Sequence, residues 1–110
     1  MSEPRDLTQE ELNAKKNEVV KNNENQFLMK FLDAVGNTER FMILEALKKK
    51  NCNVTDLGQE IDKSQSTISH HLKILESVGL IKGLKKGKFT QYSLVKENFD
   101  KIEELLKKLY

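Results

Sequence analysis

The sequence has a single cysteine, Cys52, and no long apolar segment. One cysteine excludes an intrachain disulfide framework and is typical of a reducing compartment. No stretch approaches the roughly 20 apolar residues that a membrane-spanning helix needs, and the first residues lack the apolar run of a signal peptide. We therefore expect a cytoplasmic protein.

The sequence also lacks the patterns that would indicate an enzyme. It contains no nucleophile–base signature, no phosphate-binding glycine loop and no cluster of carboxylates with an evident catalytic purpose. We expect no catalytic activity and no cofactor.

A length of 110 residues is typical of one domain. With 37% hydrophobic and 33% charged residues, a large self-sufficient core is not expected, and such a chain often completes its burial against a second copy. We divide it into an N-terminal extension, residues 1–23, and a main domain, residues 24–110. The extension has a frayed start around Pro4 and then a helix that begins at a capping box formed by Thr8 and Glu11.

Helical periodicity continues through most of the main domain. Residues 24–35 carry apolar positions at helical spacing and end at Gly36. Asn37 caps a helix at Thr38–Lys49, Asn53 caps a shorter one at Val54–Ile61, and Ser64 begins another over residues 64–78. The buried side of the helix after Asn37 is predicted to consist of Phe41, Ile43, Leu44 and Leu47.

After Gly79 the pattern alternates, as in strands. Residues 80–84 and 89–94 are predicted to form a hairpin with residues 85–88 at its tip. Residues 96–109 return to helical spacing. The fold class is therefore mainly α with a small β-hairpin, and the order of elements predicts a winged helix-turn-helix.

The helix over residues 64–78 has two different faces. The inner face is predicted to hold Ile68, His71, Leu72, Leu75 and Val78, and the outer face Ser66, Ser69, His70, Lys73 and Ser77. The two histidines point in different directions, so they are a poor pair of ligands for one metal ion.

Basic charge is concentrated in one part of the chain. Residues 63–96 contain seven lysines and one glutamate, a formal charge of +6; because the whole chain carries +2, the remainder carries −4. A local basic surface attracts phosphate, although a solvated lysine-rich face is an equally simple interpretation.

Residues 32–94 resemble the ArsR/SmtB family of winged-helix transcriptional repressors. The matching segments are LDAVGNTERFMILEAL, NVTDLGQEI, SQSTISHHLKILESVGLI and GKFTQYSL. The resemblance implies a homodimer built from the first and last helices, with the two recognition helices in successive major grooves of double-stranded DNA. It also implies an effector that changes DNA binding, which we cannot identify from the sequence.

The predicted DNA-binding residues lie on the helix over residues 64–78 and on the wing. They are Ser64, Gln65, Ser66, Thr67, Ser69, His70, Lys73, Lys85, Lys86, Lys88 and Gln91. Ser64, Ser66 and Thr67 are equally good first-turn residues of a helix. The dimer interface is predicted from the apolar stripes of the terminal helices, which exceed what a small core can cover. It comprises Phe27, Leu28, Phe31, Phe99, Ile102, Leu105, Leu106 and Leu109.

The metal sites of the family do not occur in this sequence. Where relatives carry a Cys-Val-Cys element, this chain has Asn53-Val54-Thr55, and no histidine follows His71. A soft metal needs several thiolate or imidazole ligands, so we expect no metal site. Cys52 is a possible redox sensor if the lysines at 48–50 lower the pKa of its thiol; the alternative is an inert structural thiol.

The predicted function is therefore sequence-specific binding of double-stranded DNA by a homodimeric transcriptional regulator, a repressor in type. Helix 64–78 would lie in the major groove and wing residues 85–88 on the backbone or in the minor groove. The alternatives are a non-specific architectural DNA-binding protein and a redox-responsive regulator that uses Cys52.

Overall fold

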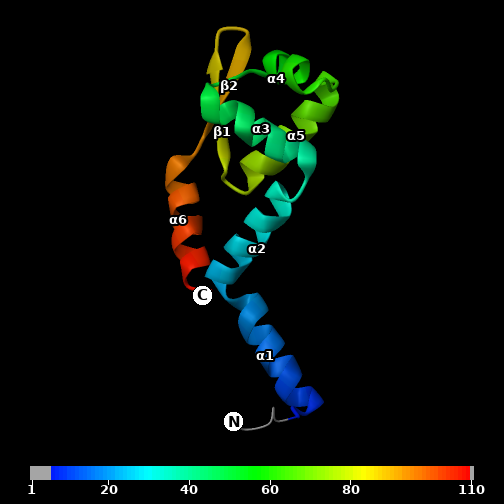
Figure 1. Cartoon of the computed structure of the whole chain (residues 1–110), viewed down its shortest axis with the longest axis vertical. Helices are drawn as coiled ribbons and strands as arrows, with labels where there is room; N and C mark the ends of the chain where they lie inside the picture. The colour runs from blue at the N-terminus through cyan, green and yellow to red at the C-terminus, as the bar shows by residue number, and fades with distance from the viewer. Residues whose placement is uncertain (1–5, 110) are drawn as a thin grey trace.

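A computed structural model describes residues 6–109, so the predicted fraying around Pro4 lies outside the described residues. Within 6–109 the chain forms six helices and one antiparallel hairpin (Figure 1). The elements are α1 (Gln9–Lys21), α2 (Asn23–Val35), α3 (Thr38–Lys49), α4 (Val54–Ile61), α5 (Gln65–Ser77), β1 (Ile81–Lys86), β2 (Phe89–Leu94) and α6 (Lys96–Lys107). This order confirms the predicted winged helix-turn-helix. None of the helices in residues 6–109 has the length and hydrophobicity required to span a bilayer.

The molecule is elongated, with extents of 62 × 25 × 24 Å. Helices α3, α4 and α5 and the hairpin form one compact body, and α2 and α6 pack against each other below it (Figure 1). Helix α1 continues away from this body and has no buried residue. A helix of 13 residues without tertiary burial is marginally stable in water, so α1 is the part of the fold that most needs a partner.

Polar side chains determine where the helices begin. The side chains of Thr8, Asn37, Asn53 and Ser64 each accept a hydrogen bond from the backbone N–H three residues later, at 2.8–3.2 Å. Asn22 ends α1 and caps α2. Since each cap is worth about 1 kcal/mol, these starts are set locally by the sequence.

The core is formed by the inner faces of the helices together with Leu80 and Ile81. Ile43, Leu44 and Leu47 of α3 are buried as predicted, but Phe41 is 53% exposed, so its predicted burial is wrong. On a helical wheel Phe41 falls outside the arc that carries Ile43, Ala46 and Leu47, and the body packs against that arc.

The hairpin differs from the prediction at its tip. β1 continues to Lys86, where it pairs with Phe89, so the turn contains only Gly87 and Lys88. Gly87 has φ +62°, the conformation that a two-residue hairpin turn favours. Leu80 lies outside the strand and is fully buried. Lys85 and Lys86 are therefore paired strand residues, and the predicted four-residue tip is wrong by these two positions.

Helix α6 packs against α2 of the same chain. Leu28, Ile102 and Leu105 are buried there, and the rings of Phe31 and Phe99 meet edge to face at 6.0 Å. Leu28, Ile102 and Leu105 therefore belong to the chain's own core, and their contribution to a dimer interface stays a prediction. Helix α6 also ends at Lys107, two residues before the predicted end.

Candidate nucleic-acid interface

Helices α4 and α5 are joined by a tight turn at Asp62 and Lys63. Asp62 adopts the left-handed conformation, with φ +60°, and the backbone N–H of Lys63 donates to the carbonyl of Gly58 at 3.0 Å. A Cβ atom at Gly58 would lie 3.0 Å from the carbonyl oxygen of Lys63, so a larger residue there would crowd the turn.

The two faces of α5 separate as predicted. Ile68, His71, Leu72 and Leu75 are buried, whereas Ser66, Ser69, His70 and Lys73 are exposed. Four adjacent side chains that can donate or accept hydrogen bonds therefore face solvent along one helix. A major groove admits such a helix and presents a distinct donor and acceptor pattern for each base pair.

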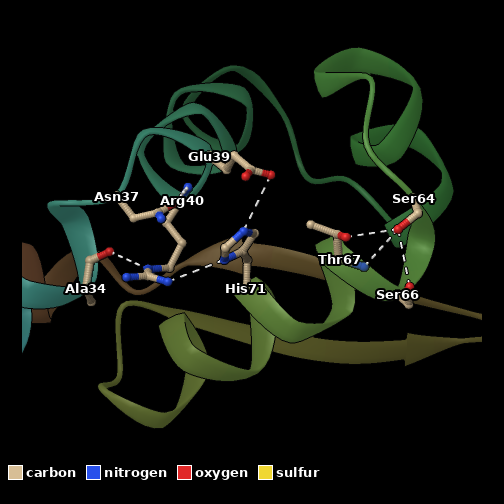
Figure 2. Close-up of polar contacts among 8 residues, drawn as sticks. All are labelled: Ala34, Asn37, Glu39, Arg40, Ser64, Ser66, Thr67 and His71. Carbon is tan, nitrogen blue, oxygen red and sulfur yellow. Dashed lines mark hydrogen bonds and ion pairs between the residues drawn. The ribbon is translucent and has the colours of Figure 1, made fainter.

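The first turn of α5 is held by a cluster of three hydroxyl groups (Figure 2). Ser64 Oγ accepts from the backbone N–H of Thr67 at 3.2 Å and donates to Thr67 Oγ1 at 3.0 Å, and it lies 3.2 Å from Ser66 Oγ. Ser64 thus caps the helix, which was the alternative to a DNA contact for this residue. Ser66 remains exposed beside the cap, while Thr67 is half-buried.

Gln65 is connected to α4. Its Nε2 donates to Thr55 Oγ1 at 3.4 Å, which restricts where the exposed amide can point. The sequence did not indicate Thr55 as a partner of Gln65. No local pattern reveals this contact, because it crosses the turn between α4 and α5.

The wing carries exposed lysines at 82, 85, 86 and 88. The tip of the hairpin and α4 lie at the end of the molecule opposite to α1 (Figure 1). Gln91 is half-buried and pairs with Leu84 in the sheet, so it lies further from the tip than the lysines at 85, 86 and 88. The wing can therefore present several positive charges to one anionic surface.

Comparison with known proteins gives the same family as the sequence motifs. A sequence model described as "Bacterial regulatory protein, arsR family" matches residues 37–82. The uncharacterized HTH-type transcriptional regulator MJ1325 of Methanocaldococcus jannaschii is 37% identical over 78 residues, which cover 67% of this chain and 81% of that protein. The chain belongs to the arsR family.

Two further similarities extend this result. The HTH-type transcriptional regulator NmtR of Mycobacterium tuberculosis is 40% identical over 63 residues, which are 57% of this chain and only 52% of NmtR. The homodimeric winged helix-turn-helix domain of Mb0332 from Mycobacterium bovis superposes with a TM-score of 0.65 at 21% identity, covering 76% of this chain and 78% of that one. The second likeness shows the winged helix-turn-helix fold.

The position of Cys52 in this arsR-family chain argues against a redox role. The residue is fully buried, its backbone pairs with Tyr92 at 2.8 and 3.3 Å, and its thiol donates to the carbonyl of Lys50 at 3.4 Å. Burial raises the pKa of the Cys52 thiol, the carboxylates of Glu60 and Asp56 raise it further, and Lys50 opposes them only in part. A buried thiol with a raised pKa is a poor oxidant sensor.

Asn53 caps α4 with its side chain, which accepts a hydrogen bond from the backbone N–H of Asp56 at 2.8 Å. Across residues 6–109 no group of three or more histidine, cysteine, aspartate or glutamate side chains is arranged to hold a metal ion.

We expect iodoacetamide to alkylate Cys52 only when the protein unfolds. The folded protein at neutral pH should react orders of magnitude more slowly than the urea-unfolded chain, since the thiol is both buried and protonated. Because Cys52 is the only cysteine, intact mass spectrometry follows a single adduct. Equal rates for the folded and unfolded chains would contradict this placement.

Proposed function

We propose that the protein is a homodimeric regulator that binds specific double-stranded DNA sites and acts as a transcriptional repressor. The observation that carries the proposal is the polar outer face of α5, which is exposed next to a basic wing while the opposite face of the helix is buried. A dimer bound at its operator would block other proteins from the same site, and this is the basis for proposing repression.

In this proposal α5 enters the major groove and its outer face reads base edges. Ser66, Ser69 and His70 are placed to contact bases or phosphates, and Lys73 lies one turn further along towards the backbone. Gln65 can pair with adenine through its amide, and its contact with Thr55 would orient the amide beforehand. Ser64 and Thr67 contribute mainly by capping the helix.

The wing supplies sequence-independent affinity. Lys85, Lys86 and Lys88 are exposed, and lysine contacts to phosphates release counterions from DNA. Gln91 would approach the backbone from the returning strand. The winged helix-turn-helix domain of residues 24–110 thus combines a base-reading helix with a backbone-binding hairpin.

The surface offered to a second copy lies at the junction of α1, α2 and the C-terminal end. Val19, Met29, Leu32 and Leu109 are exposed large apolar residues, and they line one apolar groove above the buried Leu28. An exposed apolar patch of this kind marks an interface. Phe27, Phe31, Phe99 and Leu106 are half-buried on the core between α2 and α6, and we retain them as predicted interface residues. The extension of residues 1–23 would lengthen the contact through α1.

Enrichment of genomic DNA fragments by the purified protein tests the proposed function. We expect a palindromic motif, because a symmetric dimer places two recognition helices on related half-sites. Affinity that depends steeply on salt but shows no motif would indicate an architectural DNA-binding protein instead. Absence of DNA binding at moderate salt would contradict both functions.

Single substitutions should separate backbone contacts from base contacts. Lys86→Ala is expected to weaken binding to all sequences and to reduce the slope of log affinity against log salt by about 1. Ser69→Ala and His70→Ala should also lower the ratio of specific to non-specific affinity, by about fivefold for a lost hydrogen bond. Fluorescence anisotropy with a specific and a scrambled duplex measures both quantities.

Lys30→Ala on α2 is the matched control for Lys86→Ala. It should leave DNA binding unchanged, since Lys30 is an exposed residue outside α5 and the wing. Equal losses on the two duplexes from all three test substitutions would disprove the assignment of base contacts to α5.

Leu32→Glu should dissociate the dimer. Leu32 is 46% exposed in the apolar groove, and an unpaired charge in an apolar interface costs about 3 kcal/mol, or roughly a hundredfold in the dissociation constant. Leu84→Glu, on the exposed wing, is the control and should remain dimeric. Sedimentation equilibrium distinguishes the two, and an undisturbed dimer in the Leu32 variant would place the interface elsewhere.

A further inference from the structure

Three side chains with ionisable groups meet on the inner side of α5 (Figure 2). His71 is only 7% exposed. Its Nδ1 lies 3.4 Å from a terminal guanidinium nitrogen of Arg40, and its Nε2 lies 3.6 Å from Oε2 of Glu39. The imidazole ring is therefore held between a cation and a carboxylate that both come from the first turn of α3.

The partners on its two sides determine where the ring carries its proton. A guanidinium group has only donors, so Nδ1 of His71 must accept the hydrogen bond from Arg40. The neutral ring then carries its proton on Nε2, the nitrogen that faces Glu39. Glu39 Oε2 is buried and has no hydrogen-bond partner among the described residues, which fits a carboxylate directed at this N–H.

Arg40 also connects this cluster to α2. Its Nε donates to the backbone carbonyl of Ala34 at 2.7 Å, and Ala34 is buried in the last turn of α2. One side chain thus contacts both the end of α2 and the inner face of α5. Arg40 is the only arginine within residues 6–109, and a lysine could not make both contacts with the same planar fork.

We propose that Arg40 and His71 are positioning residues that couple α2 to the recognition helix, and that protonation of His71 breaks this coupling. The inference rests on the proposed function, in which α2 contributes to the dimer and α5 reads DNA. A doubly protonated ring cannot accept from Arg40 and repels it, while its attraction to Glu39 increases. His71 then keeps only Glu39 as a partner, and the contact that runs from Ala34 of α2 through Arg40 to α5 is lost.

The consequence for DNA binding follows from geometry. In a dimer, the position of each α5 relative to its own α2 sets the distance between the two recognition helices, and half-site spacing depends on that distance. Loss of the contact between Arg40 and His71 makes the distance less fixed. Protonation of His71 should therefore weaken binding to the specific duplex more than binding to a scrambled one.

The surroundings of His71 allow this effect to be isolated. Besides Glu39 and Arg40 of α3, the titratable group near the ring is His70 of α5, with ring centroids 5.8 Å apart. Helix α4 and strand β1 also pack against α5, but within residues 6–109 neither places a charged side chain in hydrogen-bond or ion-pair contact with His71. The chain has two histidines in all, and imidazole is the side chain that ordinarily changes charge between about pH 5 and 8.

The experiment compares His70→Gln with the double variant His70→Gln, His71→Gln over this pH range. In His70→Gln, affinity for the specific duplex should fall about three- to tenfold from the alkaline to the acidic end, the effect of one lost hydrogen bond. In the double variant it should stay constant, because glutamine can accept from Arg40 and donate to Glu39 but does not titrate. His71→Gln alone measures the contribution of the exposed His70.

Identical pH profiles with and without His71 would overturn the proposal. Absence of DNA binding even at the alkaline end of the pH range would instead contradict the proposed function. In that case the contact between Arg40 and His71 is tested on the His70→Gln protein without DNA. Nitrogen-15 spectra of its single imidazole should show the proton on Nε2 in the neutral state. A neutral ring protonated on Nδ1 would exclude the hydrogen bond from Arg40 and with it the coupling.

Discussion

The inner face of α5 packs against α3, α4 and β1, and the orientation of every proposed DNA contact depends on this packing. Ile68, Leu72 and Leu75 are at most 1% exposed, so the helix cannot rotate about its axis without exposing them to water. Burial of each such side chain is worth about 1.5–3 kcal/mol. The outer face with Ser69 and His70 is therefore set by the core beneath it.

The wing and α1 lie at opposite ends of the molecule (Figure 1). The proposed DNA-binding surface is therefore distant from the part of the proposed dimer groove that α1 supplies. This arrangement suits a protein that binds an anionic polymer with one end and a second copy with the other. Between the two ends lies the contact from Ala34 through Arg40 to His71, which links the proposed dimer helix to the proposed reading helix.

Local features were the most predictable from the sequence. The predicted helix starts at Thr8, Asn37, Asn53 and Ser64 were correct. Each start is fixed by one local hydrogen bond, from the backbone N–H three residues later to the side chain of the cap. The two faces of α5 were also correct, since helical periodicity alone separates them. The fold class followed from the order of these elements, and the family followed from the motifs around α5.

Features that depend on distant contacts were less predictable. The accessibility of Cys52 depends on its pairing with Tyr92, 40 positions along the chain, and the burial of Leu28 depends on α6. The hairpin tip was misplaced because Lys85 and Lys86 are consecutive polar residues, and such residues occur both in solvated strands and in turns. Contacts that cross between elements, such as Gln65 with Thr55, leave no periodic signal in the sequence.

The central claim is that α5 and the wing form the DNA-binding surface. Chemical-shift mapping of the isotope-labelled protein with an enriched duplex tests it most directly. Binding through these two elements should produce the largest changes on the outer face of α5 and at the wing, at Ser66, Ser69, His70, Lys73, Lys85, Lys86 and Lys88. The largest changes on α1, α2 or α6, with α5 unaffected, would contradict it.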